Sequence, residues 1–393
     1  MNVPSVAPLL APYGEDLLAL RRDLHAHPET GRKEFRTSTL IAERLERAGL
    51  KPQLLNGTGV LCEIGDDGPL IALRGDIDAL PLADETGLEF ASTVAGVSHA
   101  CGHDVHTTAV LGAGLVLNDL AVAGRLTGRV RLIFQPAEEL MPGGALEVVE
   151  SGGLDGVERA YALHCDPHTD VGRVGSRVGA ITAAADHVLV RLTGRGGHTS
   201  RPHLTEDVVF ALGQLIVGLP AVLSRRIDPR AGAAMVWGAV SAGSAANAIP
   251  ARGEVAGTFR CLDNEVWVEA GALIADTIQD LTRPYGVRAD VEYVRGVPPT
   301  VNDAEAVEIL ESAVRAELGP HAVELTPQSL GGEDFSWILE KVPGAMCRLG
   351  TRTPGGRTYD LHRPDFTVDE RAIGIGARVL TAIALRDLRG RGD

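Results

Sequence analysis

The stretch Leu70-Ile-Ala-Leu-Arg-Gly75 is a short apolar run, and it is the best guide to the fold of this chain. Runs of this kind are typical of strands that are buried on both faces of a parallel sheet. Three similar runs lie at residues 59–64, 130–135 and 159–164, and helical patterns at 104–123 and 145–151 separate the later ones. Strands that alternate with helices predict an α/β domain in which helices flank a mainly parallel sheet.

A second pattern occupies residues 182–295. Strands are expected at 187–192, 233–240, 254–260 and 287–294, and helices at 206–223 and 266–281. The resulting order, β-α-β-β-α-β, is that of a ferredoxin-like unit. We therefore expect residues 182–295 to be a small domain inserted into a larger one, which is formed by residues 1–181 and 296–393.

The charge balance and the apolar stretches exclude several classes of partner. Lys and Arg number 37 against 52 Asp and Glu, a net charge of −15 that disfavours nucleic acid and anionic membrane surfaces. The most apolar stretch, residues 208–223, is interrupted by Gly, Gln and Pro and is shorter than a membrane span. The N-terminus lacks the basic start of a secretion signal, so we expect a cytoplasmic protein. Five cysteines without a C-x-x-C pair argue against a disulfide framework and a zinc ribbon.

Polar residues follow the predicted strands where ligands of open α/β sheets bind. Residues 70–75 are followed by Asp76 and Asp78, residues 130–135 by Pro-Ala-Glu138-Glu139, and the strand 159–164 ends at His164. The segment 98–104 contains Cys101 and His103 and directly precedes a helix. Each residue alone is more simply a helix cap or a structural side chain. Together they match the ligands of divalent transition metals, and the additional acidic residues suit two metals that share a water.

The sequence resembles the aminoacylase and carboxypeptidase G-type family of dinuclear metallopeptidases, in particular its amidohydrolase branch with hippurate hydrolases and auxin-conjugate hydrolases. Nine motifs carry the resemblance, in family order from about residue 20 to residue 362: LRRDLHAHPETGRKEFRTS, RGDIDALPL, HACGHDVHTT, FQPAEE, ALHC, GRGGHTSRPH, SAANAIP, GGEDF and a late LH. The resemblance implies that residues 1–181 and 296–393 form the catalytic metal-binding domain. It makes residues 182–295 a lid or dimerisation domain, through which a homo-oligomer could form.

The resemblance implies a ligand set for two divalent metal ions, zinc or manganese, with cobalt or nickel also compatible. Glu138 would be the general base on a metal-bound water. Asp78 would lie near the metals and orient a ligand, whereas Asp76 stands where other members of the family have a metal histidine. For Asp76 we favour a supporting or capping role over ligation. The implied ligands are Cys101, His103, Glu139, His164 and His362.

Further site residues come from the inserted domain and from the GGEDF segment. His198, in a glycine-rich turn, would stabilise the oxyanion of the tetrahedral intermediate, although it could also merely end the turn. Asn247 and Arg260 resemble the groups that receive the free carboxylate of the substrate. Glu333 lies in a segment that the family places near the active site, here with an unusual Gly332.

The interpretation as a whole is a metal-dependent amidohydrolase that cleaves N-acyl-amino acids, with acetyl, benzoyl or similar acyl groups, into a carboxylic acid and a free amino acid. Alternatives are a dipeptidase or carboxypeptidase of the same family and a catalytically silent binding relative. A cysteine amidase with Cys101 as nucleophile would leave the acidic and histidine residues without a role. We interpret His25, His27 and His106 as structural, and Cys165 as a core residue because it points away from His164 on a strand.

Overall fold

The computed structural model describes residues 5–390, which divide into two compact units. The larger unit contains the chain up to Ile181, the segment Val301–Pro327 and the chain from Asp334 onward. The smaller unit contains Thr182–Thr300 and Gln328–Glu333. The smaller unit therefore extends beyond residue 295 and includes a distant segment. That segment is attached by backbone pairing, because the amide of Ala183 donates to the carbonyl of Ser329 at 3.0 Å.

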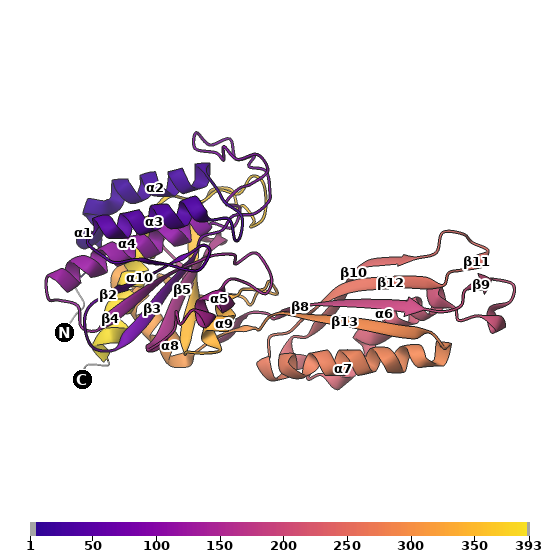
Figure 1. The fold of residues 1–393 in the computed structure, drawn as a ribbon. Helices are drawn as coiled ribbons and strands as arrows, with labels where there is room; N and C mark the ends of the chain where they lie inside the picture. Colours follow the sequence, from indigo (N-terminus) through magenta and orange to yellow (C-terminus); the bar gives the residue numbers. More distant parts are fainter. Residues whose placement is uncertain (1–4, 391–393) are drawn as a thin grey trace. The chain divides into compact units, whose positions relative to one another are not determined.

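A mixed eight-stranded sheet forms the centre of the larger unit, in the order β1-β2-β4-β3-β5-β16-β6-β15. Figure 1 labels four of these strands, β2, β4, β3 and β5. β3 runs parallel to β4 and β5, and β5 runs parallel to β16, whereas β2 and β6 are antiparallel to their neighbours β4 and β16. The carboxyl ends of β3, β4 and β5 consequently lie at the same edge. The strands are β1 Gln53–Leu54, β2 Val60–Ile64, β3 Leu70–Asp76, β4 Arg129–Gln135, β5 Val157–Asp170, β6 Val174–Ser176, β15 Val323–Leu325 and β16 Gly344–Arg352.

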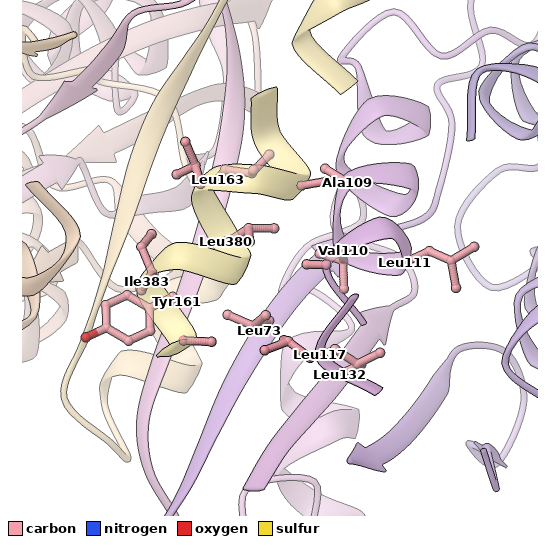
Figure 2. Packing of buried hydrophobic residues seen from close by; sticks show 14 of the residues in the cluster. Leu73, Ala109, Val110, Leu111, Leu117, Leu132, Tyr161, Leu163, Leu380 and Ile383 are labelled. Atoms are coloured by element: carbon pink, nitrogen blue, oxygen red, sulfur yellow. The ribbon is translucent and has the colours of Figure 1, made fainter. Parts of the chain in front are cut away.

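Helices cover both faces of this sheet, because its central strands are apolar on both sides. In β3, Ile71 and Leu73 pack into the larger core cluster, while Leu70 and Ala72 pack into the cluster on the opposite face. Figure 2 shows Leu73 and Leu132 of the sheet close to Val110 and Leu117 of α4. The larger cluster contains residues of α2 Gly14–Ala26, α3 Phe35–Arg47, α4 His103–Val122, α8 Ala304–Leu318 and α10 Arg371–Gly390. The cluster on the opposite face contains residues of α5 Ala145–Glu150 and α9 Phe335–Leu339. A short helix, α1 Ala7–Leu10, is the first element of the described chain.

The smaller unit is a four-stranded antiparallel sheet with two helices, α6 Val208–Arg226 and α7 Asn264–Thr282. Along the chain its main elements follow as β8-α6-β10-β12-α7-β13, and the strands lie in the order β10-β12-β8-β13. This is the ferredoxin-like arrangement expected from the sequence. Its strands are β8 Ala185–Thr193, β10 Ala234–Ala242, β12 Arg252–Arg260 and β13 Arg288–Val297, and β9 Gly197–His198 pairs with β11 Ala248–Ile249. Where the chain passes between units, β7 Gly179–Thr182 pairs with β14 Thr300–Asn302.

Sequence periodicity predicted the elements with strong local signals and missed others. The central strand β16 and the helix α8 were not predicted, and β5 continues to Asp170 beyond the expected end at His164. Two described helices, α4 and α6, are long and apolar enough to cross a membrane by length and composition alone. In α4 that apolar character is explained by packing, since 72% of its apolar window is buried in protein.

Candidate metal centre

The carboxyl edge of the central strands brings most of the predicted ligands together. His164 lies on β5, Glu138 and Glu139 follow the end of β4, and His103 is the first residue of α4. Cys101 is separated from His103 by Gly102, which has a φ of 85°. A Cβ atom at position 102 would lie 2.8 Å from the sulfur of Cys165, so glycine is required both by the backbone conformation and by the close packing.

Among the groups of side chains that could hold a metal ion, three contain Cys101 or Glu139 and overlap one another. In each group the candidate ligand atoms lie within 4.8 Å of one another. Two of the groups share Cys101, which suggests a site with two neighbouring positions. The groups are Cys101–His103–His164, Cys101–Glu139–His362 and His103–Glu138–Glu139.

The ring of His103 is oriented by Asp78. Its Nδ1 atom lies 2.9 Å from the main-chain oxygen of Asp78 and 3.2 Å from Oδ1 of the carboxylate. The Nε2 atom therefore faces the cluster, where it lies 3.9 Å from Oε1 of Glu139 and 4.0 Å from Oε2 of Glu138. This nitrogen is fully buried and has no hydrogen-bond partner among residues 5–390.

His164 is oriented in a similar way by the backbone. Its Nδ1 atom donates to the carbonyl oxygen of Cys165 at 2.8 Å. The Nε2 atom then lies 3.5 Å from the sulfur of Cys101. Two ligands of one tetrahedral ion, at bond lengths of 2.0–2.3 Å, are roughly 3.4 Å apart. The spacing of this pair therefore matches two ligands of one metal ion.

Glu139 and His362 form the more open side of the centre. The Nε2 atom of His362 lies 3.2 Å from Oε1 of Glu139, and 53% of the His362 side chain is exposed. The backbone amide of Glu139 donates to Oδ2 of Asp78 at 3.0 Å. His362 has a φ of 59° and Ala137, just before Glu138, a φ of 53°. Such conformations are uncommon for residues other than glycine, and strained backbone of this kind often occurs at active sites.

Burial and nearby charges set the protonation of the candidate ligands. Burial raises the pKa of the Cys101 thiol well above its usual value, and the charge of Glu139 adds to this effect. Burial also lowers the pKa of His164, and Arg348 adds to this, so the imidazole is neutral as a metal ligand must be. For His103, burial disfavours the charged form, but the charge of Asp76 and the contacts with Cys101 and Asp78 outweigh it and raise its pKa. A bound cation would reverse the state of the thiol, because a coordinating cysteine is deprotonated.

These observations fit a transition-metal site. Thiolate, imidazole and carboxylate are the ligand types of zinc and related ions. The buried Nε2 atom of His103, which lacks a partner among the described residues, has the orientation of a ligand. The carboxylate of Asp78 contacts Nδ1 of His103 and the backbone amide of Glu139, and so orients both residues. Carboxylates that support metal ligands in other proteins act in this way.

Asp76 lies close to His103 but is already engaged on both oxygens. Arg74 donates from Nη1 to Oδ2 of Asp76 at 2.7 Å, and His106 donates from Nδ1 to Oδ1 at 2.6 Å. Arg74 also binds Asp334 at 2.7 Å. Sequence reasoning did not single out Arg74, although a charged residue within an otherwise apolar buried strand is a signal that could have identified it.

Within the smaller unit, His198 and Asn247 lie together, whereas Arg260 lies at the far end of β12. His198 pairs with Ala248 between β9 and β11, and the amide of Thr199 donates to the carbonyl of Asn247 at 3.2 Å, so His198 and Asn247 are neighbours. Arg260 ends β12, whose other end, Arg252, follows shortly after β11. At the usual rise per residue, the nine-residue strand β12 spans roughly 26 Å. Asn247 and Arg260 of one copy therefore do not share one small ligand.

The remaining candidates have the following surroundings. Glu333 is buried, and its carbonyl accepts a hydrogen bond from the hydroxyl of Thr300 at 3.4 Å within the smaller unit. His25 is buried between Asp104, at 2.7 Å, and Asp84, at 3.3 Å, and neither it nor His27 belongs to a metal-ligand group among the described residues. Cys165 packs in the larger core cluster, on the opposite face from His164.

Comparison with known proteins identifies the family of this chain. A Rhodococcus jostii protein named glutamate–cysteine ligase 2-3 is 49% identical over 377 residues, which are 95% of this chain but 47% of that protein. The chain thus spans about half the length of that relative. The N-acetyl-L-cysteine deacetylase of Bacillus subtilis is 38% identical over 93% of this chain and 86% of its own.

A solved structure has the same fold over nearly the whole length of this chain. It is a Bacillus subtilis protein described as a dinuclear metal binding peptidase from the M20 family, with a TM-score of 0.84 and 33% identity over 96% of this chain and 99% of that one. The sequence profile of peptidase family M20/M25/M40 matches residues 72–386, which include Asp76 and all the ligand candidates. The chain belongs to peptidase family M20/M25/M40.

Proposed function

We propose that the protein is a metal-dependent amidohydrolase that cleaves N-acyl-amino acids into a carboxylic acid and a free amino acid. The observation that carries this proposal is the convergence of five ligand side chains beside Glu138, with the unpartnered Nε2 of His103 facing the cluster. Family membership supports amide-bond hydrolysis, and the name of the Bacillus subtilis deacetylase describes the removal of an acetyl group from an N-acyl-amino acid.

Two divalent metal ions, zinc or manganese, with cobalt or nickel also compatible, are the cofactors in this proposal. One would be held by residues of the group Cys101, His103 and His164 and the other by residues of the group Cys101, Glu139 and His362. When bound, the ions would polarise the amide carbonyl and make a water molecule more acidic. A Bacillus subtilis relative described as a dinuclear metal binding peptidase supports the number of ions.

Glu138 carries the proton transfers. Its side chain is 10% exposed and lies beside the ligand Glu139, within reach of a water at the centre. Glu138 takes a proton from the water as the water oxygen attacks the acyl carbon. It then gives this proton to the nitrogen as the C–N bond breaks, so that a carboxylic acid and an amine are released. Asp78 keeps His103 and Glu139 in place during both steps.

The smaller unit would act as a lid that also joins two copies of the chain. In this proposal His198 stabilises the oxyanion, while Asn247, Arg260 and Glu333 contact the substrate, and Arg260 binds its carboxylate. Because β12 spans roughly 26 Å, Asn247 and Arg260 would contact a substrate at one centre only if they came from different copies of the chain.

The edge strand β10 supports assembly into a homo-oligomer. Among the described residues it has a neighbouring strand on one side only, and Val236 and Val240 on it are 59% and 60% exposed. Exposed apolar residues on an unpaired edge favour pairing with another chain. We place the enzyme in the cytoplasm, with small N-acyl-amino acids as substrates and without nucleic acid or membrane partners, in keeping with its net charge of −15.

The test is a hydrolysis screen with metal-stripped protein reloaded with Zn²⁺, Mn²⁺, Co²⁺ or Ni²⁺. Substrates are N-acetylcysteine, other N-acetyl-amino acids, N-benzoyl- and N-indoleacetyl-amino acids, and simple dipeptides. The proposal expects metal-dependent release of the amino acid from at least one N-acyl substrate. Faster cleavage of the dipeptides would favour a dipeptidase, and no turnover with any metal would favour a catalytically silent relative.

A further inference from the structure

His106 lies between His103 and His164, the two buried histidines that would bind metal. Its own ring nitrogens are both hydrogen-bonded to protein atoms, so it cannot bind a metal ion itself. Its ring centroid is 5.0 Å from that of His164 and 5.3 Å from that of His103, and its side chain is fully buried. Asp76, His103 and His106 are close enough to form a metal-ligand group. The hydrogen bonds of His106 exclude metal binding by this residue, because they occupy both ring nitrogens.

The tautomer of His106 is fixed by two partners. The backbone amide of Cys165 can only donate, and it lies 2.8 Å from Nε2 of His106. Nε2 therefore carries the lone pair, and the proton of the neutral ring is on Nδ1. That atom donates to Oδ1 of Asp76 at 2.6 Å. Neither nitrogen of His106 is left for a metal.

Asp76 is held in turn and is equally unavailable as a ligand. Its second carboxylate oxygen accepts from Arg74 at 2.7 Å. Arg74 is fixed by Asp334 at 2.7 Å and by Gln135 at 2.9 Å. All these side chains are buried, so the direction of the Asp76 carboxylate toward His106 is set by the packed interior.

These hydrogen bonds continue from His106 through the backbone of Cys165 to His164, which would bind metal. The amide of Cys165 is bound by His106, and the carbonyl oxygen of the same residue accepts from Nδ1 of His164. The position of that carbonyl determines which way Nε2 of His164 points, and it points to Cys101 at 3.5 Å. Loss of the acceptor at position 106 would leave the buried Cys165 amide unpaired and free the backbone that orients His164.

We propose that Asp76 and His106 are positioning residues that aim His164 at the metal centre by holding the backbone of Cys165. The inference rests on the proposed function only in requiring that His164 binds a metal. It gives Asp76 a role that excludes ligation, and it gives His106 a role that excludes metal binding and proton transfer to the substrate.

The test measures metal affinity in three variants of His106. His106→Phe keeps a ring but loses the donor and the acceptor, and His106→Asn keeps a donor toward Asp76 but loses the acceptor for Cys165. His106→Gln keeps an acceptor at the depth of Nε2. Apoprotein affinity for Zn²⁺ is measured by competition with a chelator, and the absorption spectrum of the Co²⁺ form reports the thiolate and imidazole geometry.

We expect roughly 10–100-fold weaker binding and an altered Co²⁺ spectrum for the Phe and Asn variants, and recovery of most of the affinity in the Gln variant. Tyr161→Phe is the matched control, because it removes a buried hydrogen bond to Asp387 from the same strand, β5, at 2.8 Å. It should lower thermal stability and leave metal affinity and the Co²⁺ spectrum unchanged.

Several results would overturn the proposal. Wild-type affinity and spectrum in the Phe variant would do so, and so would equal affinities of the Asn and Gln variants. If His106→Phe does not fold, the comparison of His106→Asn with His106→Gln decides. Asp76→Asn gives a second measurement. It should weaken metal binding, because its amide group would have to face a donor, either Arg74 or His106. A wild-type protein that binds no divalent cation would instead refute the proposed function.

Discussion

His103 and Asp78 are joined twice, since Nδ1 of the ring lies 2.9 Å from the main-chain oxygen of Asp78 and 3.2 Å from its carboxylate. The other carboxylate oxygen accepts from the amide of Glu139. Asp78→Ala should therefore weaken metal binding roughly 10–100-fold, because both ligands lose their support. Chelator competition measures this. Asp387→Asn serves as the control. Asp387 is a buried acidic residue that accepts a hydrogen bond from Tyr161 and does not belong to the centre, so this variant should keep wild-type metal affinity.

Glu138→Gln should retain two metal ions per chain and the wild-type fold but lose turnover. The amide has the shape of the carboxylate and cannot accept the proton of the attacking water. The expected loss in kcat is roughly 10² to 10⁴. Metal analysis and steady-state kinetics check both parts, and near-normal turnover would remove Glu138 from the mechanism.

Cys101 should behave as a ligand and not as a nucleophile. Chelation should abolish activity, and Zn²⁺, Mn²⁺ or Co²⁺ should restore it, because the burial that raises the pKa of this thiol makes it a poor nucleophile without a metal. Mass spectrometry during turnover should show no acylated protein. A thioester trapped on Cys101 would support the cysteine amidase instead.

His198→Ala should lower kcat, and Arg260→Ala should mainly raise KM for substrates that have a free carboxylate, with metal content unchanged in both. A carboxamide analogue of the substrate is the control for Arg260, since its binding should not depend on the guanidinium. If Arg260→Ala impairs the acid and the carboxamide equally, the carboxylate-binding role is wrong.

The same two variants test whether one centre uses two copies of the chain. Mixed dimers of His198→Ala with Arg260→Ala would contain one centre with both residues intact. An equal mixture of the two variants should therefore recover up to about a quarter of wild-type activity after subunit exchange. If the mixture is no more active than its components, His198 and Arg260 at one centre come from the same copy.

Asp369 should contribute stability that depends on pH. Its carboxylate accepts from the Arg371 side chain and from the hydroxyl of Thr353, and the bond to Arg371 is the main reason why its pKa falls from 3.8 to about 2. A depressed pKa in the folded state stabilises the fold above pH 3.8, and this contribution is lost as the pH falls toward 2. Asp369→Asn should lower the Tm at pH 7, and the difference from wild type should shrink between pH 4 and pH 2. A constant difference would contradict this origin.

Local sequence patterns were sufficient for the strands and helices whose signal is periodic. The runs that form β2 to β5 and the alternation of β8 are visible because burial on one or both faces imposes apolar residues at fixed spacing. The residue types at the candidate centre could be predicted for a related reason. Polar residues that directly follow buried strands must lie at the carboxyl edge of a parallel sheet, and there Glu138 and Glu139 are found, whereas His164 lies within β5, which continues to Asp170.

The tertiary structure alone decided which distant segments meet. β16 is inserted beside β5 although the two are far apart in sequence, and no local pattern specifies such a pairing. The bond between Arg74 and Asp334, and the place of His106 between two ligands, depend on this long-range order. The separation of Asn247 from Arg260 was also hidden in the sequence, because motif order does not show at which end of a strand a residue lies in space. The chain itself therefore determines the chemical types at the centre, whereas the packing of the sheet determines their partners and orientation.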